Sequence, residues 1–292
     1  MLGEIRGDVR FKEPLSFHTS LRIGGPADIF VIPQDLDDIR HALAFAHREQ
    51  LPVNVIGGGN NLLVHDRGVH GVVIKIEGCL GRAEFNGEEA VAGAGVSLSA
   101  LIREAAALNL GGIEALVGIP ATVGGALAMN AGTADGHIGD FVSGVYFLHA
   151  DGSIGEFKPN TSGFAYRAVE FPPDSVLVGC RLQFHRRPQA EVQRDIKQRL
   201  KHKKSTQPLA LASAGWVWKD PAGESAARLV EKSGLKGKRM NGAEISAKHT
   251  NFIVNRGGAS AADVRALIDL SRERVHAQFG ITLEPELRCL GG

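Results

Sequence analysis

The chain has 292 residues, enough for two domains or for one large domain with insertions. Hydrophobic residues make up 43% and charged residues 22%, which is the composition of an ordinary globular protein. The 33 basic and 32 acidic side chains leave a net charge of only +1, so no overall charge would draw the protein to nucleic acid or to a membrane.

The cysteines are few and far apart along the chain: Cys79, Cys180 and Cys289. An odd, sparse set without a C-x-x-C motif argues against a disulfide framework or a zinc site and favours a reducing compartment. The N-terminus is charged and lacks an apolar signal segment, and no run of 18 apolar residues exists. We therefore expect a cytoplasmic protein that binds neither a metal nor a membrane.

The first predicted elements are a glycine loop at residues 19–28, a strand at 29–32 and a helix. Asp35 is placed to cap that helix, which ends before Pro52. One face of the helix carries apolar side chains at a helical spacing, namely Leu36, Ile39, Leu43 and Ala46.

The stretch from residue 53 to 76 organises the rest of the prediction. A short apolar run suited to a buried strand leads into glycines 57–59 and asparagines 60–61, and apolar alternation then resumes. Glycines allow positive φ and close approach of a ligand, and successive free N–H groups form a nest that binds anions. The spacing fits neither a P-loop nor G-x-G-x-x-G. A tight hairpin and a pyrophosphate-binding nest both remain open interpretations.

A second unusual stretch, at residues 118–132, is rich in glycine and alanine. A hairpin around Asn86-Gly87 and a helix capped by Ser97 are predicted before it. Its hydroxyl and amide groups are confined to Thr122 and Asn130. It is either a place where small residues let backbones touch or a second loop around a large flat ligand.

Strands are predicted next, at 144–150, 154–157 and 175–184, and a basic segment follows at 185–207. A nucleic-acid patch would need aromatic residues among the basic ones to stack bases, and this segment has none after Phe184. We interpret it as a solvated linker or helix and place the domain boundary there.

The last third mixes helices and strands. A short helix is predicted at 225–232 and a strand at 251–255, and Ser260 with Asp263 forms an acidic version of the capping box at the start of a long helix. A final strand at 281–287 would carry Glu284 and Glu286 on one side. The whole chain is therefore predicted to be α+β.

Seven segments in order resemble the UDP-N-acetylenolpyruvoylglucosamine reductase family: TSLRIGGPAD, VIGGGNNLLVHDRGVHGVVI, GIPATVGGALAMNAG, FAYR, SAG-x-x-x-K-x-P, NGAEISAKHTNFIVN and LEPELR. The resemblance runs from about residue 19 to 291 and is closest to the shorter subtype. It implies an FAD-binding region of the vanillyl-alcohol-oxidase (PCMH) type in two subdomains at 1–187, a basic linker or helix at 188–206 and an α+β substrate domain at 207–292.

The same resemblance implies noncovalent FAD, NADPH as hydride donor and a UDP-sugar substrate. It places the FAD pyrophosphate on the first glycine stretch and continues the cradle into the second, with the cofactor-binding residues Gly57, Gly58, Gly59, Asn60, Asn61, Gly118, Ile119, Thr122, Gly124, Gly125 and Asn130. Arg167 would stabilise charge on the substrate carboxylate, and Glu286 would lie near the carbon that is protonated. Tyr166, Lys219 and Asp220 would bind substrate.

This chain departs from the family pattern in the loop that supplies the proton. Trp216 stands where the family has a serine, and its indole N–H is not a plausible acid near neutral pH. Asp220 replaces an asparagine near the substrate diphosphate, and Val169 replaces a serine after Tyr166.

The expected function is NADPH-dependent reduction of the enolpyruvyl UDP-sugar to UDP-N-acetylmuramate in peptidoglycan synthesis. One alternative is a relative that binds FAD but turns over slowly or not at all. Another, from a different class, is a module that binds anions or nucleic acid without catalysis. We expect no nucleic acid among the partners.

Overall fold

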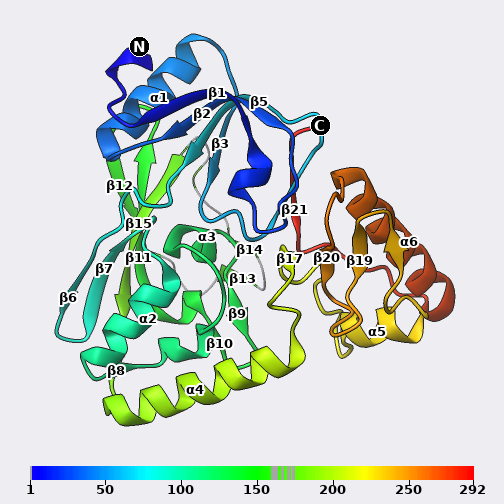
Figure 1. The fold of residues 1–292 in the computed structure, drawn as a ribbon. Helices are drawn as coiled ribbons and strands as arrows, with labels where there is room; N and C mark the ends of the chain where they lie inside the picture. The colour runs from blue at the N-terminus through cyan, green and yellow to red at the C-terminus, as the bar shows by residue number, and fades with distance from the viewer. Residues whose placement is uncertain (1, 159–163, 166–167, 170–171, 173–174) are drawn as a thin grey trace. The chain divides into compact units, whose positions relative to one another are not determined.

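The computed structural model describes residues 2–158, 164–165, 168–169, 172 and 175–292 (Figure 1). Helices are mixed with runs of mostly antiparallel strands, which confirms the α+β class. The described α-helices are α1 Leu36–Arg48, α2 Leu98–Ala107, α3 Val123–Ala128, α4 Gln189–Thr206, α5 Ala226–Lys232 and α6 Ala261–Phe279.

The larger described sheets contain strands β1 Asp8–Pro14, β2 Pro26–Ile32, β3 Val53–Ile56, β5 Val69–Lys75, β6 Ala83–Asn86, β7 Glu89–Gly93, β11 Val142–His149, β12 Ile154–Phe157, β15 Ser175–Gln183, β17 Ala212–Ser213, β18 Arg239–Met240, β19 Ala243–Ile245 and β20 Ile253–Asn255. Two-stranded pairs are formed by β4 Leu62–Val64 with β21 Arg288–Leu290, β8 Leu110–Gly111 with β16 His185–Arg186, β9 Gly132–Thr133 with β10 Gly136–His137, and β13 Phe164–Ala165 with β14 Ala168–Val169.

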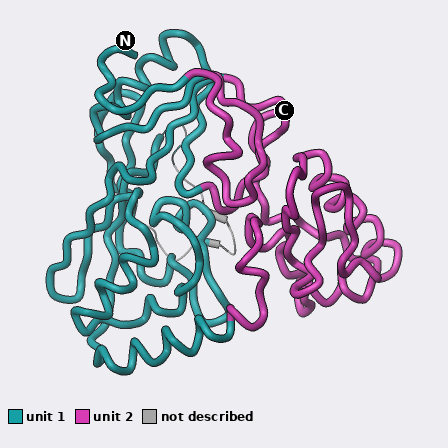
Figure 2. Tube along the Cα trace, in the orientation of Figure 1, with its two compact units in different colours: residues 1–10, 29–58, 71–202 teal, residues 11–28, 59–70, 203–292 magenta. Residues whose placement is uncertain are grey.

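The chain divides into two compact units, coloured separately in Figure 2. Unit 1 comprises residues 1–10, 29–58 and 71–202, and unit 2 comprises 11–28, 59–70 and 203–292. Two segments that are early in the sequence therefore belong with the C-terminal third. Sequence order does not reveal this, because contacts between distant segments decide it.

Helix α1 packs on the sheet of order β1-β2-β5-β3, in which β3 and β5 run parallel. The predicted cap at Asp35 is confirmed, since its side chain accepts hydrogen bonds from the backbone N–H groups of Asp37 and Asp38. The buried residues between helix and sheet include Ile39, Ala42, Val72 and Ile74. Burial of these apolar surfaces is what stabilises the helix, because an isolated helix of this length is marginal in water.

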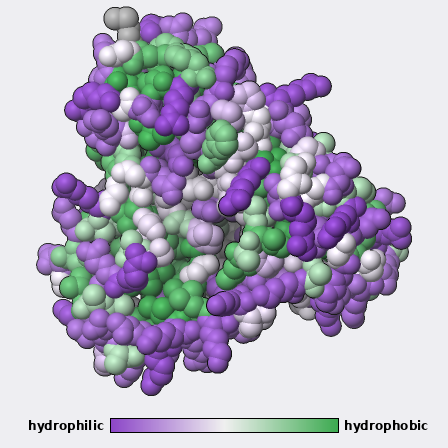
Figure 3. Space-filling view, viewed as in Figure 1, coloured by the Kyte–Doolittle hydropathy of each residue, from purple (hydrophilic) through white to green (hydrophobic). Residues whose placement is uncertain are grey.

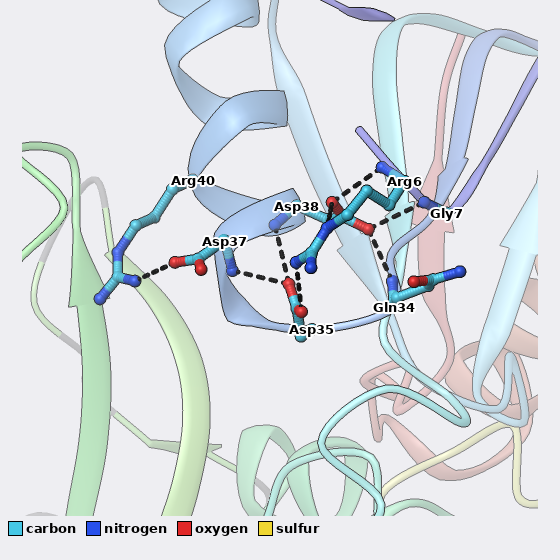
Figure 4. A network of polar contacts seen from close by, with 7 residues as sticks. All are labelled: Arg6, Gly7, Gln34, Asp35, Asp37, Asp38 and Arg40. Carbon is cyan, nitrogen blue, oxygen red and sulfur yellow. Dashed lines mark hydrogen bonds and ion pairs between the residues drawn. The ribbon is translucent and has the colours of Figure 1, made fainter. Parts of the chain in front are cut away.

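A buried carboxylate connects α1 to the residues just before β1 and to a residue just after β2 (Figure 4). Asp38 is fully buried and accepts hydrogen bonds from the backbone N–H groups of Arg6, Gly7 and Gln34 at 2.9–3.0 Å. Burial alone would raise the pKa of Asp38, but these three N–H groups and the charge of Arg6 lower it below its usual value. The contact therefore stabilises the fold as long as Asp38 stays ionised.

The second sheet of unit 1 has the order β12-β11-β15-β7-β6 and is antiparallel throughout. The predicted hairpin is confirmed as β6–β7, with Gly87 at φ 62° in the turn. Helices α2 and α3 cover a core that includes Leu101, Leu127 and Leu182. Ser97 does precede α2 as predicted, but its hydroxyl contacts Ser99 and makes no capping bond.

Unit 2 packs α5 and α6 against the antiparallel sheet β17-β20-β19-β18. The predicted capping box of Ser260 and Asp263 is confirmed, and Asp66 adds two further bonds to the first N–H groups of α6 at 2.8 and 3.1 Å. In β19 the buried Glu244 pairs with Arg239 and Arg256. The Arg256 bond chiefly lowers the pKa of Glu244, against the opposing effect of burial and with help from Arg239.

The final strand was predicted too early. Residues 281–287 form no strand, and β21 begins at Arg288 and pairs in parallel with β4. Pro285 lacks a backbone N–H and cannot continue a ladder. It makes only an isolated bridge with Trp218, flanked by Glu284 and Glu286.

Most of the basic segment forms one helix, α4, and the surface over this helix in Figure 3 is hydrophilic. Val192 is its one buried residue. Arg187, just before the helix, pairs with Asp195 of α4 and with the buried Glu114. In the described part of the chain, no helix is both long and apolar enough to span a lipid bilayer.

Candidate active site

The first glycine stretch joins two strands that are not neighbours in any sheet. Strand β3 pairs with β5 and strand β4 pairs with β21, both in parallel. A hairpin would require β3 and β4 to pair with each other in antiparallel fashion. The hairpin interpretation of residues 57–61 is therefore wrong.

The glycines of this loop lie where a side chain does not fit. Within unit 1, a Cβ on Gly57 would stand 2.4 Å from Oγ1 of Thr122. Within unit 2, Gly59 has φ 64°, and a Cβ there would stand 2.0 Å from the carbonyl oxygen of His18. Glycine is required at both positions by close approach and, at Gly59, by backbone conformation as well.

The backbone N–H groups of this loop are left available. None of those at residues 57–61 donates a hydrogen bond to another described residue. The carbonyl groups behave differently, because Gly59 accepts from the N–H of Ser20 and Asn61 accepts from that of Arg288, both at 3.1 Å. A loop whose carbonyls bond to the protein while its N–H groups do not is suited to an anion such as a pyrophosphate.

The second glycine stretch contains a helix where a loop was expected. Thr122 is buried and caps α3, its Oγ1 accepting from the N–H of Gly125 at 3.1 Å. A Cβ on Gly124 would stand 2.9 Å from Cβ of Ala94, so small-residue packing does explain that position. Gly118 has φ 78°, and the N–H of Ile119 donates to Leu116.

Asn130 lies near the end of the second stretch and is buried with φ 39°. Its Oδ1 accepts a hydrogen bond from the N–H of Gly139 at 3.1 Å. An asparagine tolerates this left-handed backbone better than most residues. The structure thus gives Thr122 and Asn130 local structural roles, and these do not conflict with a role toward a cofactor.

Unit 2 brings together three segments that the sequence singled out. In the loop that departs from the family pattern, the carbonyl of Val217 accepts from the N–H of Glu286 at 2.8 Å, and the N–H of Lys219 donates to the carbonyl of Glu284 at 3.0 Å. The carbonyl of Glu286 also accepts from Nδ2 of Asn61 at 3.0 Å. The loop at 214–220, the C-terminal motif and the end of the glycine stretch are therefore bonded to one another.

Asn251 completes this arrangement, and the sequence gave no role for it beyond a strand position. It is 1% exposed, and its Oδ1 accepts from the N–H of Trp218 at 2.8 Å while its Nδ2 donates to the carbonyl of Trp218 at 2.9 Å. Its own carbonyl accepts from Val217. The motif NFIVN was the available signal, because a buried asparagine in an apolar strand must find polar partners.

Trp216 is half-buried and stacks on His249, with ring centroids 6.0 Å apart and planes 28° apart. The ring of Phe252 also packs on His249 in a T-shaped arrangement, with ring centroids 5.1 Å apart and planes 78° apart. Nδ1 of His249 accepts from the N–H of Asn251 at 3.3 Å, which leaves the proton of the neutral ring on Nε2. Burial lowers the pKa of His249, and the charge of Asp220 opposes that shift.

Lys219 and Asp220 both have partners within unit 2. The ammonium of Lys219 pairs with Glu284, whose side chain is 69% exposed. Oδ1 of Asp220 accepts from the N–H of Ala226, the first residue of α5, at 2.8 Å. A carboxylate at that place is favourable for the helix, because it bonds an N–H that lacks an intrahelical partner.

Tyr166 and Arg167 lie outside the described residues. Val169, which replaces the serine expected after Tyr166, belongs to β14. In the part of the chain that is described, no group of three or more His, Cys, Asp or Glu side chains is placed to hold a metal ion.

Comparison with known proteins covers both parts of the chain. Residues 207–290 match the family described as UDP-N-acetylenolpyruvoylglucosamine reductase, C-terminal domain, and residues 27–158 match the FAD binding domain family. A UDP-N-acetylenolpyruvoylglucosamine reductase from Anaeromyxobacter sp. is 43% identical over 98% of this chain and 90% of its own. One from Moorella thermoacetica is 41% identical over 100% and 97%.

Solved structures agree with these relatives. The UDP-N-acetylenolpyruvylglucosamine reductase of Thermus caldophilus is 36% identical, with a TM-score of 0.83 over 98% of this chain and 99% of that one. The Physcomitrella patens BBE-like 1 structure is 15% identical with a TM-score of 0.50, over 94% of this chain and 59% of that one, and it shows the fold alone. The FAD-binding region is of the vanillyl-alcohol-oxidase type, as expected. The chain belongs to the UDP-N-acetylenolpyruvoylglucosamine reductase family and is a flavin-dependent oxidoreductase with FAD as its cofactor.

Proposed function

We propose that this protein uses NADPH to reduce UDP-N-acetyl-3-O-(1-carboxyvinyl)-glucosamine to UDP-N-acetylmuramate in peptidoglycan synthesis. The observation that carries the proposal is similarity along almost the whole length of relatives that bear this reductase's name. The bonded arrangement of Asn61, Val217 and Glu286 in unit 2 supports it, because those residues come from three of the family's motifs.

The glycine loop fits the pyrophosphate of FAD. Its unbonded N–H groups at residues 57–61 would hold the anion, and Gly57 and Gly59 would let it approach. Two histidines that follow the glycine loop in the sequence make hydrogen bonds within the protein. Nδ1 of His65 accepts from the N–H of Arg67, and the ring of His70 bonds Asp28 at 2.7 Å. These contacts support noncovalent FAD.

When bound, FAD would supply hydride transfer from NADPH to the enolpyruvyl group. The protein's task is then to bind the substrate, to stabilise negative charge on its carboxylate and to protonate its C2 carbon. Arg167 would meet the carboxylate, since a planar guanidinium can bond both oxygens. Glu286 would lie near C2, held there through its backbone by Val217 and Asn61. Tyr166, Lys219 and Asp220 would line the sugar nucleotide.

A second candidate function is a homologue that binds FAD but protonates C2 slowly. The observation in its favour is Trp216, whose stacked indole offers no acidic proton in place of a serine hydroxyl. Both candidates predict a yellow protein that NADPH reduces. They differ only in how fast the reduced protein is reoxidised by the enolpyruvyl UDP-sugar.

Anaerobic stopped-flow absorbance separates the two candidates. The holoprotein is first mixed with NADPH and the bleaching of the flavin band is followed, and enolpyruvyl UDP-sugar is then added. Return of the flavin band at about 1–10³ s⁻¹ would support the full reductase. Bleaching without return would support the impaired homologue, and absence of bleaching by NADPH would refute both.

We further propose a functional division into an FAD-binding region at 1–187, the α4 linker at 188–206 and a substrate domain at 207–292. The match of residues 207–290 to a separate C-terminal domain supports the last boundary. A cytoplasmic location is supported by three free cysteines, which are typical of a reducing compartment.

A further inference from the structure

Arg22 has a backbone conformation that its side chain does not favour. Its φ is 56°, in the left-handed region that glycine adopts readily and that long side chains adopt seldom. Such outliers persist where the surrounding structure imposes them, and they gather at sites that bind ligands.

Three neighbours impose this conformation. The hydroxyl of buried Thr19 donates to the carbonyl of Ile23 at 2.9 Å, and the N–H of Ile23 donates back to that hydroxyl at 3.3 Å. The carbonyl of Leu21 accepts from Nδ2 of Asn255 at 3.0 Å. Leu21 and Ile23 are buried on either side, while Arg22 between them is exposed. The turn therefore presents this one side chain to the outside.

The turn is packed on the glycine loop. The N–H of Ser20 donates to the carbonyl of Gly59 at 3.1 Å, and Thr19 Cα stands 3.1 Å from where a Cβ of Gly59 would be. The N–H of Arg22 donates to the carbonyl of Thr19, which closes a β-turn and keeps their Cα atoms within about 7 Å. The Cα of Arg22 therefore lies within about 10 Å of Gly59, a span that the long arginine side chain can bridge toward a ligand on the nest.

The guanidinium of Arg22 is not used in a polar contact among the described residues. Arg6, Arg187 and Arg256 are each paired with carboxylates, but no ion pair or hydrogen bond joins the Arg22 side chain to another residue of the described ranges. An arginine fork bonds phosphate oxygens in pairs and remains charged at every physiological pH.

We propose that Arg22 is an anion-binding residue that contacts a phosphate group of a ligand held at the glycine loop. The proposal rests on the function proposed above, because that function places a pyrophosphate on residues 57–61. FAD, NADPH and the UDP-sugar all carry phosphate groups of this chemistry, so any of the three is a possible source.

The test compares Arg22→Gly and Arg22→Lys with the parent holoprotein. Glycine relieves the left-handed strain and removes the cation, whereas lysine keeps the strain and the charge but loses the fork. Gln50→Gly is the matched control, because Gln50 has φ 55° and is exposed just after α1 in unit 1. The experiment measures the melting temperature and three affinities. These are the FAD dissociation constant by flavin fluorescence, the NADPH concentration for half-maximal flavin reduction, and UDP binding to the holoprotein.

Gln50→Gly should melt about 2–4 °C higher than the parent, as expected for relief of this strain in a chain of this size, and should keep its affinity for all three ligands. Only Arg22→Gly should lose affinity, by about 10-fold or more, for whichever phosphate ligand it meets. Arg22→Lys should fall between the parent and Arg22→Gly. The ligand whose affinity falls identifies the source.

Unchanged affinity for FAD, NADPH and UDP in Arg22→Gly would overturn the proposal. These binding measurements need no turnover of the enolpyruvyl substrate. A parent that binds all three ligands but does not reduce that substrate would refute the proposed function and leave Arg22 to be judged by affinity alone.

Discussion

The glycine loop at 57–61 and the loop at 214–220 use their backbones in opposite ways. The glycine loop leaves its N–H groups without partners in the described chain, whereas Val217, Trp218 and Lys219 all donate theirs to protein acceptors. A loop that binds a ligand through its backbone has no room for side chains at the points of close approach, so glycine occupies those positions. A loop whose backbone is bonded to protein from Val217 to Lys219 can keep its course when a neighbouring side chain changes, and it carries Trp216 at the position where the family resemblance implies a serine.

The largest expected effect comes from filling the glycine loop. Gly57→Val should yield a folded protein that purifies without flavin, because its Cβ would collide with Oγ1 of Thr122, which is buried and bonded to Gly125. The ratio of flavin absorbance to protein absorbance measures this. Gly3→Val is the control, since a Cβ on Gly3 has no atom within 4 Å. A Gly57→Val protein with full flavin content would show that the loop is not the cradle.

The second prediction concerns the side chain of Trp216 in the loop at 214–220. Trp216→Ser should speed reoxidation by the enolpyruvyl UDP-sugar by about 10²–10⁴-fold, the usual contribution of a general acid. The hydrogen bonds that Glu286 and Asn251 make with the loop involve the backbone of residues 217–218 and should survive. Flavin reduction by NADPH serves as the internal control and should not change. A parent as fast as the serine variant would mean that the proton comes from elsewhere.

Asp220→Asn sharpens the same comparison. The amide oxygen of asparagine can still accept from Ala226, so the start of α5 should be preserved while one negative charge is removed. If Asp220 repels the substrate diphosphate, the double variant with Trp216→Ser should bind substrate more tightly than Trp216→Ser alone. Equal half-saturation by substrate in the two would exclude that repulsion.

Arg167→Lys should slow reoxidation by about 10²–10³-fold, because the ammonium keeps the charge but not the fork that bonds a carboxylate twice. Reduction by NADPH should be nearly unaffected. Arg186→Lys, at an exposed arginine with a 3.5 Å pair to Glu88, is the matched exchange. Reoxidation of the lysine variant at the parent rate would show that Arg167 has no catalytic role.

Replacing Asn251 should disrupt the hydrogen bonds that hold the 214–220 loop in place. Asn251→Ala would leave both backbone groups of buried Trp218 without partners, at a cost of about 2–5 kcal/mol in the free energy of unfolding. Asn251→Asp should cost less, because it can still accept from the Trp218 N–H. Thermal unfolding of the three proteins measures the series. Equal stability of alanine and aspartate variants would refute the two-bond account.

These two regions also show how far the sequence could predict the structure. Helix α1, the β6–β7 hairpin and the capping box of α6 were predictable because caps, turns and periodicity are local signals. The strand expected at 281–287 was wrong because Pro285 confines pairing to one bridge. The role of Asn251 could not be predicted, since its partner Trp218 lies 33 residues away and only tertiary packing joins them.

The smallest expected effect is a titration of the pair formed by Trp216 and His249. Because burial lowers the pKa of His249, its folded-state pKa lies below the ordinary 6.5, and the folded protein resists protonation more than the unfolded chain does. The contribution of His249 to stability is therefore full above about pH 6.5 and is lost as the pH falls through the lowered value. Asp220 opposes this shift, so Asp220→Asn should lower the midpoint further.

Protonation places a cation against the indole of Trp216, so fluorescence followed from pH 8 to 4 reports the midpoint. His249→Gln is the control that should abolish the transition. A midpoint above 6.5 in the parent would show that Asp220, rather than burial, governs His249, and that the loop carries a protonated imidazole beside Trp216.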